Sequence, residues 1–286
     1  MAYLHIDNLY KNQDILLFKE CYALEKIHGT SAHISWKNNE IRFFSGGEKH
    51  EKFVSLFDKD TLISKFKELD VEEIVIYGEA YGGKCQGMSG TYGEELKFVV
   101  FDVKIGEYWL SVPDAENVAI ALVLEFVHYR RISTNLAEID RERDYPSKQA
   151  YRNGIKDSKK AEGIVLRPLM ELSKNNGKRI ICKHKRDDFR ETNTSRKVSP
   201  EKLVVLSKAN EVADEWVTPM RLSHILDKIE DPSMEKMGDI IKAMVADVKR
   251  EGEGEIEWSK SIGKAIGKKT ALMTKEYFQN KLTEGV

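Results

Sequence analysis

The pattern of apolar residues changes near residue 194, and this change most constrains the fold. Before it, apolar runs are short and rich in β-branched and aromatic residues, as in strands; they lie at residues 41–44, 74–77, 98–103, 164–166 and 179–182. After it, apolar residues recur at spacings of three and four, as on one helix face. The sequence therefore predicts an α+β domain over residues 1–194 and an all-helical domain over residues 195–286.

One long helix is predicted within the β-rich region. Residues 114–129 place Val118, Leu122 and Phe126 at helical spacing, with Ala121 and Glu125 beside them. One side of such a helix is apolar enough to cover a sheet. A long element of this kind fits an α+β domain with a sheet core.

Three segments of the C-terminal region open with a capping residue followed by proline: Ser199-Pro200, Thr218-Pro219 and Asp231-Pro232. Serine, threonine and aspartate accept hydrogen bonds from the free N–H groups of a first helical turn, and proline is well tolerated there. Each pair therefore predicts a helix start.

The last helical segment is rich in lysine. Lys260, Lys264 and Lys268 recur at a spacing of four, Lys269 follows, and the arrangement predicts one uniformly basic helix face. Solvation of an exposed surface and contact with phosphate groups explain such a face equally well.

Composition narrows the functional classes. The chain has 286 residues, of which 41% are hydrophobic and 33% charged, and its net charge is −1. No apolar run approaches the ~18 residues of a membrane helix, and the N-terminus lacks the layout of a signal peptide, so a cytoplasmic protein without membrane contact is expected. The three cysteines, far apart, predict buried thiols rather than disulfides or zinc ligands. Any nucleic-acid contact must rest on local basic surface.

The candidate chemistry lies in five short blocks. The first places Lys26 at the end of a strand-like run, before a glycine turn: Leu24-Glu25-Lys26-Ile27-His28-Gly29. A lysine that attacks phosphorus must first lose its proton, which an ordinary pKa of ~10.4 opposes unless cations or burial lower it. The other blocks supply charged neighbours: Ile76-Tyr77-Gly78-Glu79, Phe98-Val99-Val100-Phe101-Asp102, Glu162-Gly163-Ile164-Val165-Leu166-Arg167-Pro168 and Ile181-Cys182-Lys183-His184-Lys185.

These blocks, in this order, resemble the covalent nucleotidyltransferase superfamily of polynucleotide ligases and capping enzymes. His-Gly after Lys26, together with the blocks at Glu162 and Lys183, looks most like the RNA ligase 2 family, over about residues 20–190. The resemblance implies a nucleotidyltransferase (ATP-grasp-like) core of antiparallel sheet. The all-helical C-terminal domain also fits, because DNA ligases and capping enzymes usually carry a β-rich OB domain there. That helical domain is expected to bind RNA.

The resemblance implies an ATP-dependent RNA ligase that uses Mg²⁺ or Mn²⁺. In three steps, lysine takes AMP from ATP, AMP moves to an RNA 5′-phosphate, and a 3′-hydroxyl displaces AMP to join the strands. The expected partner is RNA with 5′-phosphate and 3′-OH ends, in a nicked duplex, and the expected state is a monomer.

The resemblance also assigns residues. Lys26 is the nucleophile, Lys183 and Lys185 hold the α-phosphate, and Glu162 binds the metal or orients Lys26. Strand periodicity independently places Lys183 and Lys185 on one face. Glu79 accepts from the ribose, and Phe101 stacks on adenine, leaving Phe98 for the core. The remaining nucleotide-binding candidates are Glu25, Ile27, His28, Arg42 and Arg167.

Two positions depart from the family pattern. Ser31 stands where asparagine is usual. Phe44 stands where an arginine usually precedes a small-residue-Gly turn, which leaves Arg42 as the nearest substitute.

Three alternatives remain open. They are a DNA-nick ligase, a GTP-dependent guanylyltransferase, and a non-catalytic RNA-binding protein in which the helical domain is the working part. The presence of Lys26, Glu162, Lys183 and Lys185 together argues against the last.

Overall fold

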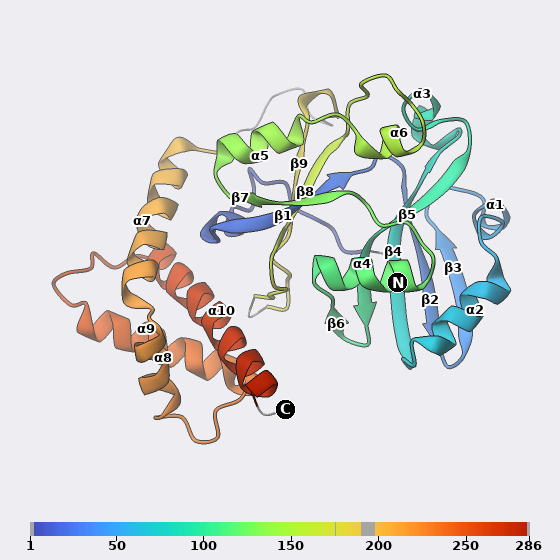
Figure 1. Cartoon of the computed structure of the whole chain (residues 1–286). Helices are drawn as coiled ribbons and strands as arrows, with labels where there is room; N and C mark the ends of the chain where they lie inside the picture. The colour runs from blue at the N-terminus through green and yellow to red at the C-terminus, as the bar shows by residue number, and fades with distance from the viewer. Residues whose placement is uncertain (1–2, 175, 190–197, 285–286) are drawn as a thin grey trace. The chain divides into compact units, whose positions relative to one another are not determined.

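The N-terminal part of the chain is built on two antiparallel sheets (Figure 1). The computed structural model describes residues 3–174, 176–189 and 198–284. The first sheet has the order β7-β1-β8-β9, with β1 (Glu20–Lys26), β7 (Tyr129–Ser133), β8 (Gly163–Pro168) and β9 (Cys182–Lys185). The second has the order β3-β2-β4-β5-β6, with β2 (Thr30–Lys37), β3 (Glu40–Ser45), β4 (Glu73–Gly82), β5 (Leu96–Ile105) and β6 (Tyr108–Trp109).

Short helices connect the strands. In chain order they are η1 (Asp14–Leu17), α1 (His50–Val54), α2 (Lys59–Glu68), η2 (Cys85–Gly87), α3 (Ser89–Tyr92), α4 (Val112–Ala121), α5 (Leu136–Arg143), α6 (Lys148–Arg152) and η3 (Asp187–Phe189). Side-chain caps set several of their starts: Asp58 accepts from two backbone N–H groups at the beginning of α2, and Ser111 accepts from one at the beginning of α4. Capped starts between strands account for the α+β pattern.

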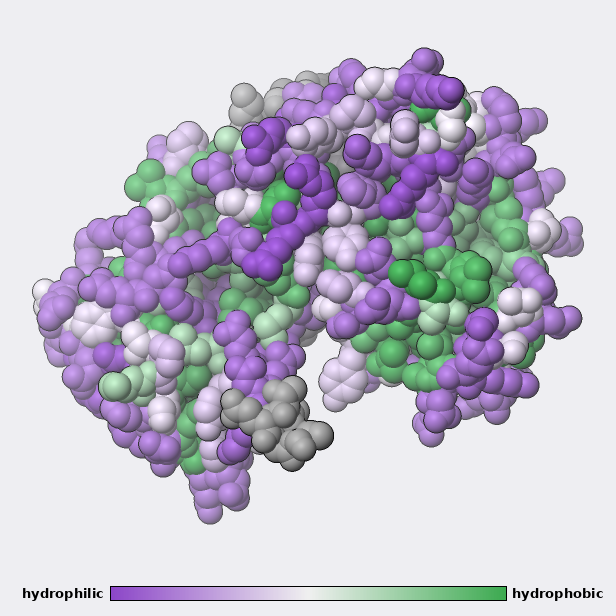
Figure 2. All heavy atoms as spheres, viewed as in Figure 1, coloured by the Kyte–Doolittle hydropathy of each residue, from purple (hydrophilic) through white to green (hydrophobic). Residues whose placement is uncertain are grey.

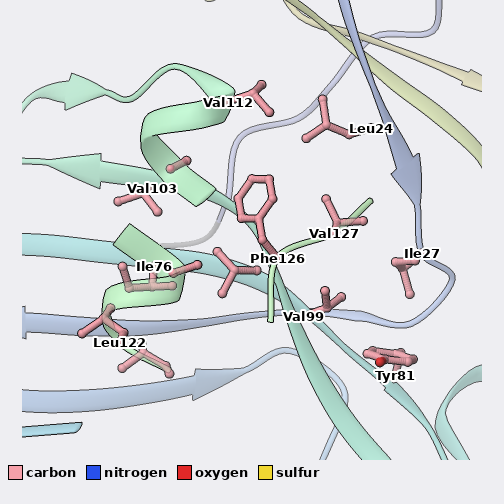
Figure 3. Close-up of a cluster of buried hydrophobic side chains, with 14 of the residues drawn as sticks. Leu24, Ile27, Ile76, Tyr81, Val99, Val103, Val112, Leu122, Phe126 and Val127 are labelled. Carbon is pink, nitrogen blue, oxygen red and sulfur yellow. The ribbon is translucent and has the colours of Figure 1, made fainter. Parts of the chain in front are cut away.

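The main core lies where α2, α4 and the two sheets meet. Figure 3 shows Leu24 and Ile27 from the first sheet near Val99 of the second, with Phe126 and Val127 nearby. In β2, alternate residues Ile34 and Trp36 are buried, because successive strand side chains point to opposite faces. The rings of Trp36 and Phe66 of α2 stack with centroids 5.5 Å apart. The three cysteines are buried thiols, as expected.

The long helix predicted over residues 114–129 is wrong in its second half. Helix α4 ends at Ala121, and Val123 has a positive φ of 58°. The following segment runs beside β5, where Val100 N donates to Glu125 O at 2.8 Å and Val127 N donates to Val100 O at 2.8 Å. Phe126, Val127 and Tyr129 fit a pleated surface, and pairing with β5 outweighs the helical spacing.

Helix α4 leaves apolar side chains in solvent. Ile120 is 63% exposed, and Val123, just beyond the end of the helix, is 74% exposed. Figure 2 shows apolar surface gathered over this helix, on a face that is otherwise largely hydrophilic. The buried side of α4, with Val112, Ala115 and Ala119, faces the core instead.

The strand predicted over residues 179–182 is shifted. The β9 ladder begins at Cys182, whereas Arg179 forms an isolated bridge with Ser173 in the preceding turn. The run Arg179-Ile180-Ile181 reads as a strand by composition, but Arg179 is held by buried carboxylates. The register therefore depends on a tertiary ion pair that local sequence does not show.

The C-terminal part is helical. It contains α7 (Pro200–Trp216), α8 (Pro219–Leu226), η4 (Met234–Lys236), α9 (Met237–Glu251) and α10 (Lys260–Glu284). The chain divides into two compact units, Met1–Arg196 and Lys197–Val286. Apolar residues at helical spacing form the interior of the second unit, among them Leu222, Ile240, Met244 and Ile266. No helix in the described ranges has the length and apolar composition that crossing a membrane requires.

Two of the three predicted helix starts are observed. Helices α7 and α8 begin at Pro200 and Pro219, and Thr218 Oγ1 accepts from Arg221 N at 3.2 Å. The start predicted at Asp231-Pro232 is wrong, because α9 begins only at Met237. Asp231 has a φ of 43°, and an N-cap residue needs extended backbone.

The lysines of α10 do not all lie free on the surface of the helix. Lys260 and Lys264 are exposed, but Lys269 forms an ion pair with Asp214 of α7. Part of the predicted basic face therefore holds the helical unit together.

Replacing Phe66 by alanine is expected to lower the free energy of unfolding of the N-terminal unit by about 3–5 kcal/mol, because the ring is fully buried against Trp36. Chemical denaturation measures the change. The control is Tyr108→Ala, whose side chain is 79% exposed and whose loss should cost about 0.5 kcal/mol or less. Equal effects of the two variants would contradict this packing.

Candidate active site

Three neighbouring strands bring charged side chains together at one end of the first sheet. Strand β1 ends at Lys26, β8 begins directly after Glu162, and β9 ends at Lys185. In the ladder, Gly163 pairs with Lys26 on one side and with Lys185 on the other. A Cβ on Gly163 would lie 2.2 Å from the His184 carbonyl oxygen, so this close approach requires glycine.

Glu162 is the centre of this group. Its carboxylate accepts from Lys26 Nζ at 2.9 Å and lies 2.9 Å from Lys185 Nζ, one lysine on each oxygen. His28 Nδ1 lies 3.1 Å from the oxygen that Lys26 contacts. The Glu162 side chain is only 2% exposed. Burial alone would raise the pKa of Glu162, but the charges and hydrogen bonds of Lys26 and Lys185 hold it below the ordinary value.

A cavity of about 390 Å³ adjoins Lys26 and lies between the two sheets. This volume is within the usual range of small-molecule sites, roughly 300–1,000 Å³. The predicted site residues that line it are Glu25, Lys26, Ile27, Glu79, Phe101, Arg167 and Lys183. Ser31, noted for its departure from the family pattern, lines it too.

Glu79 provides a buried acceptor in this cavity. It lies on β4, and its Oε1 accepts from Gly29 N at 3.1 Å. Burial raises the pKa of Glu79 to about 7, against the lowering effect of Lys26. A carboxyl group with this pKa can change protonation near neutral pH.

Phe101 and Phe98 have different surroundings, although both belong to β5. Phe101 lines the cavity and meets the ring of Tyr3 edge-on, with centroids 4.9 Å apart. Phe98 packs against Phe53 and Phe57 in an aromatic cluster, with centroids 5.4 and 5.5 Å away. Phe101 therefore lies at the cavity, whereas Phe98 belongs to the aromatic cluster of the interior.

Arg167 lines the cavity, but its charge is engaged elsewhere. The side chain is 1% exposed, and its guanidinium donates to Asp102 Oδ1 at 3.0 Å and Leu110 O at 2.6 Å and forms an ion pair with Glu171. Arg179 pairs with the same two carboxylates. Arg167 thus neutralises Asp102 and Glu171 beside the cavity, and its predicted contact with the nucleotide stays a prediction.

Glu25 is also a structural residue. Its carboxylate accepts from Ser147 Oγ at 2.5 Å and from the backbone N–H groups of Lys148 and Gln149 at 2.9 and 3.1 Å. These bonds secure the start of α6. Glu25 also lines the cavity, and its predicted contact with the nucleotide stays a prediction beside this helix-anchoring role.

Arg42 is not among the residues that line the cavity, and its predicted contact with the nucleotide stays a prediction. Arg42 lies on the edge strand β3, where its side chain is 79% exposed and pairs with Glu40. The alternation of side chains predicts which face of a strand a residue occupies. It does not predict the distance between an edge strand and the site. His28 and Ile27 do lie at the site, with His28 at Glu162 and Ile27 buried in the cavity wall.

Sequence reasoning missed the N-terminal segment. Residues 3–6 line the cavity, and Tyr3 OH donates to Asp102 Oδ2 at 2.6 Å. The segment continues beside β9, where Leu9 N donates to Lys183 O at 2.8 Å and Lys183 N donates to Asp7 O at 2.9 Å. Local sequence carries no signal for the pairing with Lys183. The one hint of the Tyr3 contact is that Asp102 directly follows Phe101.

The residues that the structure describes form no group of three or more His, Cys, Asp or Glu side chains able to hold a metal. A protein-only metal cage is therefore absent from these residues. Glu162 is a buried carboxylate beside a cavity of nucleotide size, and Mg²⁺ commonly binds one or two carboxylates together with substrate phosphates and water. The donor set fits a metal that arrives with a phosphate ligand.

Comparison with known proteins gives one consistent result. The family model described as RNA ligase matches residues 19–185, more than half of the chain. Comparison with curated proteins finds no match. Among solved structures, a ligand-free mutant of Naegleria gruberi RNA ligase and a second mutant with ATP and Mn each match with a TM-score of 0.52 and 15% identity. Both matches cover 66% of this chain and 56% of that one. A structure of the same ligase with PPi matches with a TM-score of 0.50 and 16% identity, over 66% of this chain and 57% of that one. The likeness establishes a shared fold, and the chain spans little more than half the length of those proteins.

Glu79→Gln is expected to change the pH dependence of stability. The folded-state pKa of Glu79, about 7, lies above its ordinary value of 4.5, so the folded protein binds the extra proton. The free energy of unfolding of the wild type therefore falls as pH rises from about 4.5 to about 7. Glu79 contributes up to roughly 3 kcal/mol to this fall, and the variant lacks that contribution. Denaturation at pH 5 and pH 8 measures the difference, with the exposed Glu72→Gln as control. An unchanged difference between variant and wild type at the two pH values would refute the assignment.

Proposed function

This chain belongs to the RNA ligase family, and we propose that it is an ATP-dependent RNA ligase that joins 3′-hydroxyl and 5′-phosphate ends through a lysyl-AMP intermediate. The observation that carries the proposal is Lys26. Its amine contacts a buried carboxylate, and it lines a cavity that also presents Glu79, Phe101 and Lys183. A nucleophile beside a nucleotide-sized cavity is what the first step of such a reaction requires.

In the proposed first step, neutral Lys26 Nζ attacks the α-phosphorus of ATP. A P–N bond forms, the bond to the bridging oxygen breaks, pyrophosphate leaves, and the nitrogen releases one proton to solvent. Lys26 and Lys185 share the Glu162 carboxylate, each at 2.9 Å, so Glu162 aligns the nucleophile while Lys185 stays beside it. Lys183 and Lys185 then bring positive charge to phosphate oxygens on which negative charge develops.

Two further residues are proposed to position the nucleotide. Phe101 offers an aromatic face to adenine, since stacking on an aromatic ring suits any base. Glu79 accepts from a ribose hydroxyl inside the cavity. Mg²⁺ or Mn²⁺ bound at Glu162 would neutralise charge on the phosphate oxygens.

The later steps use the same lysines. AMP passes from Lys26 to an RNA 5′-phosphate, which releases the lysine amine, and a 3′-hydroxyl then attacks the activated phosphate and expels AMP. Each step transfers a phosphoryl-type group, so the catalytic demand is positioning and charge neutralisation. The helical unit, Lys197–Val286, is proposed to bind RNA through exposed lysines such as Lys260 and Lys264. A nicked duplex is the proposed substrate, bound by a monomer.

Incubation with ATP and Mg²⁺ is expected to add one AMP to the intact wild-type protein and none to Lys26→Ala, because Lys26 is the proposed nucleophile. Intact-protein mass spectrometry measures the gain. The matched control is Lys37→Ala, a lysine on β2 paired with Glu73, which should gain AMP as wild type does. Labelling of Lys26→Ala would move the nucleophile to another residue, and no labelling of wild type would remove the ligase proposal.

The polymer and nucleotide are tested separately. With a 5′-phosphorylated nick in duplex RNA, wild type is expected to seal with ATP and to form no covalent adduct with GTP. The same nick in duplex DNA should be sealed at least about ten-fold more slowly, a difference of roughly 1.4 kcal/mol in the barrier. Denaturing gels quantify the product. Equal sealing of DNA would identify a DNA-nick ligase, and an adduct with GTP alone would identify a guanylyltransferase.

A further inference from the structure

The turn that follows the proposed nucleophile is held by side chains from distant parts of the chain. This turn comprises residues 27–29 and connects β1 to β2. His28 N donates to the Tyr92 hydroxyl at 3.3 Å, and Gly29 N donates to Glu79 Oε1 at 3.1 Å. Backbone N–H groups that are removed from water need an acceptor, and here side chains provide it. The conformation of the turn therefore depends on Tyr92 and Glu79.

Tyr92 is itself fixed where it meets the turn. Its side chain is fully buried, and its ring meets the ring of Tyr81 edge-on, with centroids 5.2 Å apart. The loop that carries it, between β4 and β5, is closed by a hydrogen bond of 2.9 Å from Gly83 N to Gly93 O. Burial raises the pKa of Tyr92, so the hydroxyl stays uncharged at physiological pH and can accept from His28 N.

Helix α6 holds Tyr92 from its C-terminal end. Asn153, the residue that follows the last turn of α6, donates from Nδ2 to Tyr92 O at 2.8 Å. Its Oδ1 accepts from Lys97 Nζ at 3.2 Å, which fixes the orientation of the amide. Gln149 of the same helix donates to the Tyr81 hydroxyl at 2.8 Å. Helix α6 therefore holds both Tyr92 and the ring against which Tyr92 packs.

The other end of α6 is bound to the residue that precedes the nucleophile. The Glu25 carboxylate accepts from three donors at the N-terminus of this helix. A helix of only five residues thus reaches the chain on both sides of Lys26. It contacts Glu25 directly, and it contacts His28 through Tyr92.

The His28 side chain connects these contacts to the nucleophile. His28 Nδ1 and Lys26 Nζ lie on the same oxygen of Glu162, at 3.1 and 2.9 Å. A shift of the His28 backbone would therefore disturb the group that aligns the Lys26 amine. A displacement of about 1 Å at a reacting group can lower a rate about 100-fold. Neither Tyr92 nor Asn153 lines the cavity beside Lys26, so their effect is on position and not on contact with the nucleotide.

We propose that Tyr92 and Asn153 are positioning residues for the transfer of AMP to Lys26, and that α6 holds the backbone on both sides of this lysine. The inference deepens the proposed function and rests on it, because the step that it serves is the attack of Lys26 on ATP. Binding of ATP does not depend on these two residues, since the lining of the cavity is left intact.

The test measures the single-turnover rate of AMP transfer to the protein over a range of ATP concentrations. Tyr92→Phe removes only the hydroxyl, and Asn153→Asp removes the N–H donor but keeps an oxygen for Lys97. At saturating ATP each variant is expected to label about ten-fold more slowly than wild type, with an unchanged half-saturating ATP concentration. Because both variants act through the same bond to His28, the double variant should be no slower than Tyr92→Phe alone.

Tyr129→Phe is the matched control. It also removes a tyrosine hydroxyl from the N-terminal unit, one that donates to Glu116 of α4 at 2.6 Å, and it should label as wild type does. Equally slow labelling of Tyr129→Phe would assign the effect to a general loss of stability and overturn the proposal. A higher half-saturating ATP concentration with an unchanged maximal rate would make Tyr92 a binding residue and overturn it too.

A second readout does not need the reaction. In protein made with ¹⁵N-labelled histidine, the His28 backbone amide signal is assigned with His28→Gln. It should shift and exchange faster with solvent in Tyr92→Phe and Asn153→Asp, but not in Tyr129→Phe. An unchanged signal in the first two variants, or wild-type labelling rates in both, overturns the positioning roles alone. Absence of labelling in wild type overturns the ligase proposal and, with it, these roles in AMP transfer.

Discussion

The ion-paired carboxylate of Glu162 is the interaction on which the rest of the site depends. It is almost fully buried, yet Lys26, Lys185 and His28 all contact it. A buried charge is tolerated only when partners compensate its desolvation, and removing one partner of such a group typically costs about 3–5 kcal/mol. The three partners come from β1, from the turn that follows it and from β9, so the same interaction that arranges the chemistry also holds the strand ends in register.

The order of the sequence blocks predicted the site correctly where strand pairing brings those blocks together. Lys26, Glu162 and Lys185 were expected to meet, and antiparallel pairing through Gly163 explains why they do. It gave no sign of the hydrogen bonds and ion pairs that two of the predicted site residues form with other parts of the chain. Glu25 anchors α6 and Arg167 neutralises Asp102, and neither partner is a sequence neighbour. For the fold, periodicity identified β3, β4, β5 and β8, but it extended α4 through residues 122–129 because packing against β5 is a tertiary effect.

The charged network around Asp102 supports the site indirectly, because it holds the strand that carries Phe101. Arg167 and Arg179 both bind Asp102, and Tyr3 donates to the same carboxylate. Asp102 follows Phe101 directly, so the network fixes the backbone that carries the cavity's aromatic wall. Arg167 and Arg179 are almost fully buried and paired with Asp102 and Glu171, so the network makes this wall of the cavity rigid.

The pairing of residues 7–9 with Lys183 has a consequence for how the protein is made. A wall of the cavity comes from a segment that is synthesised early, while its partner strand β9 is translated more than 170 residues later. At ribosomal rates of about 5–20 residues per second, this segment waits roughly 10–35 s before its hydrogen-bonding partner exists. Contacts of such long sequence separation also slow folding. The cavity beside Lys26 is therefore among the last features of the N-terminal unit to form, and a ribosome-bound chain that has not yet reached β9 lacks one of its walls.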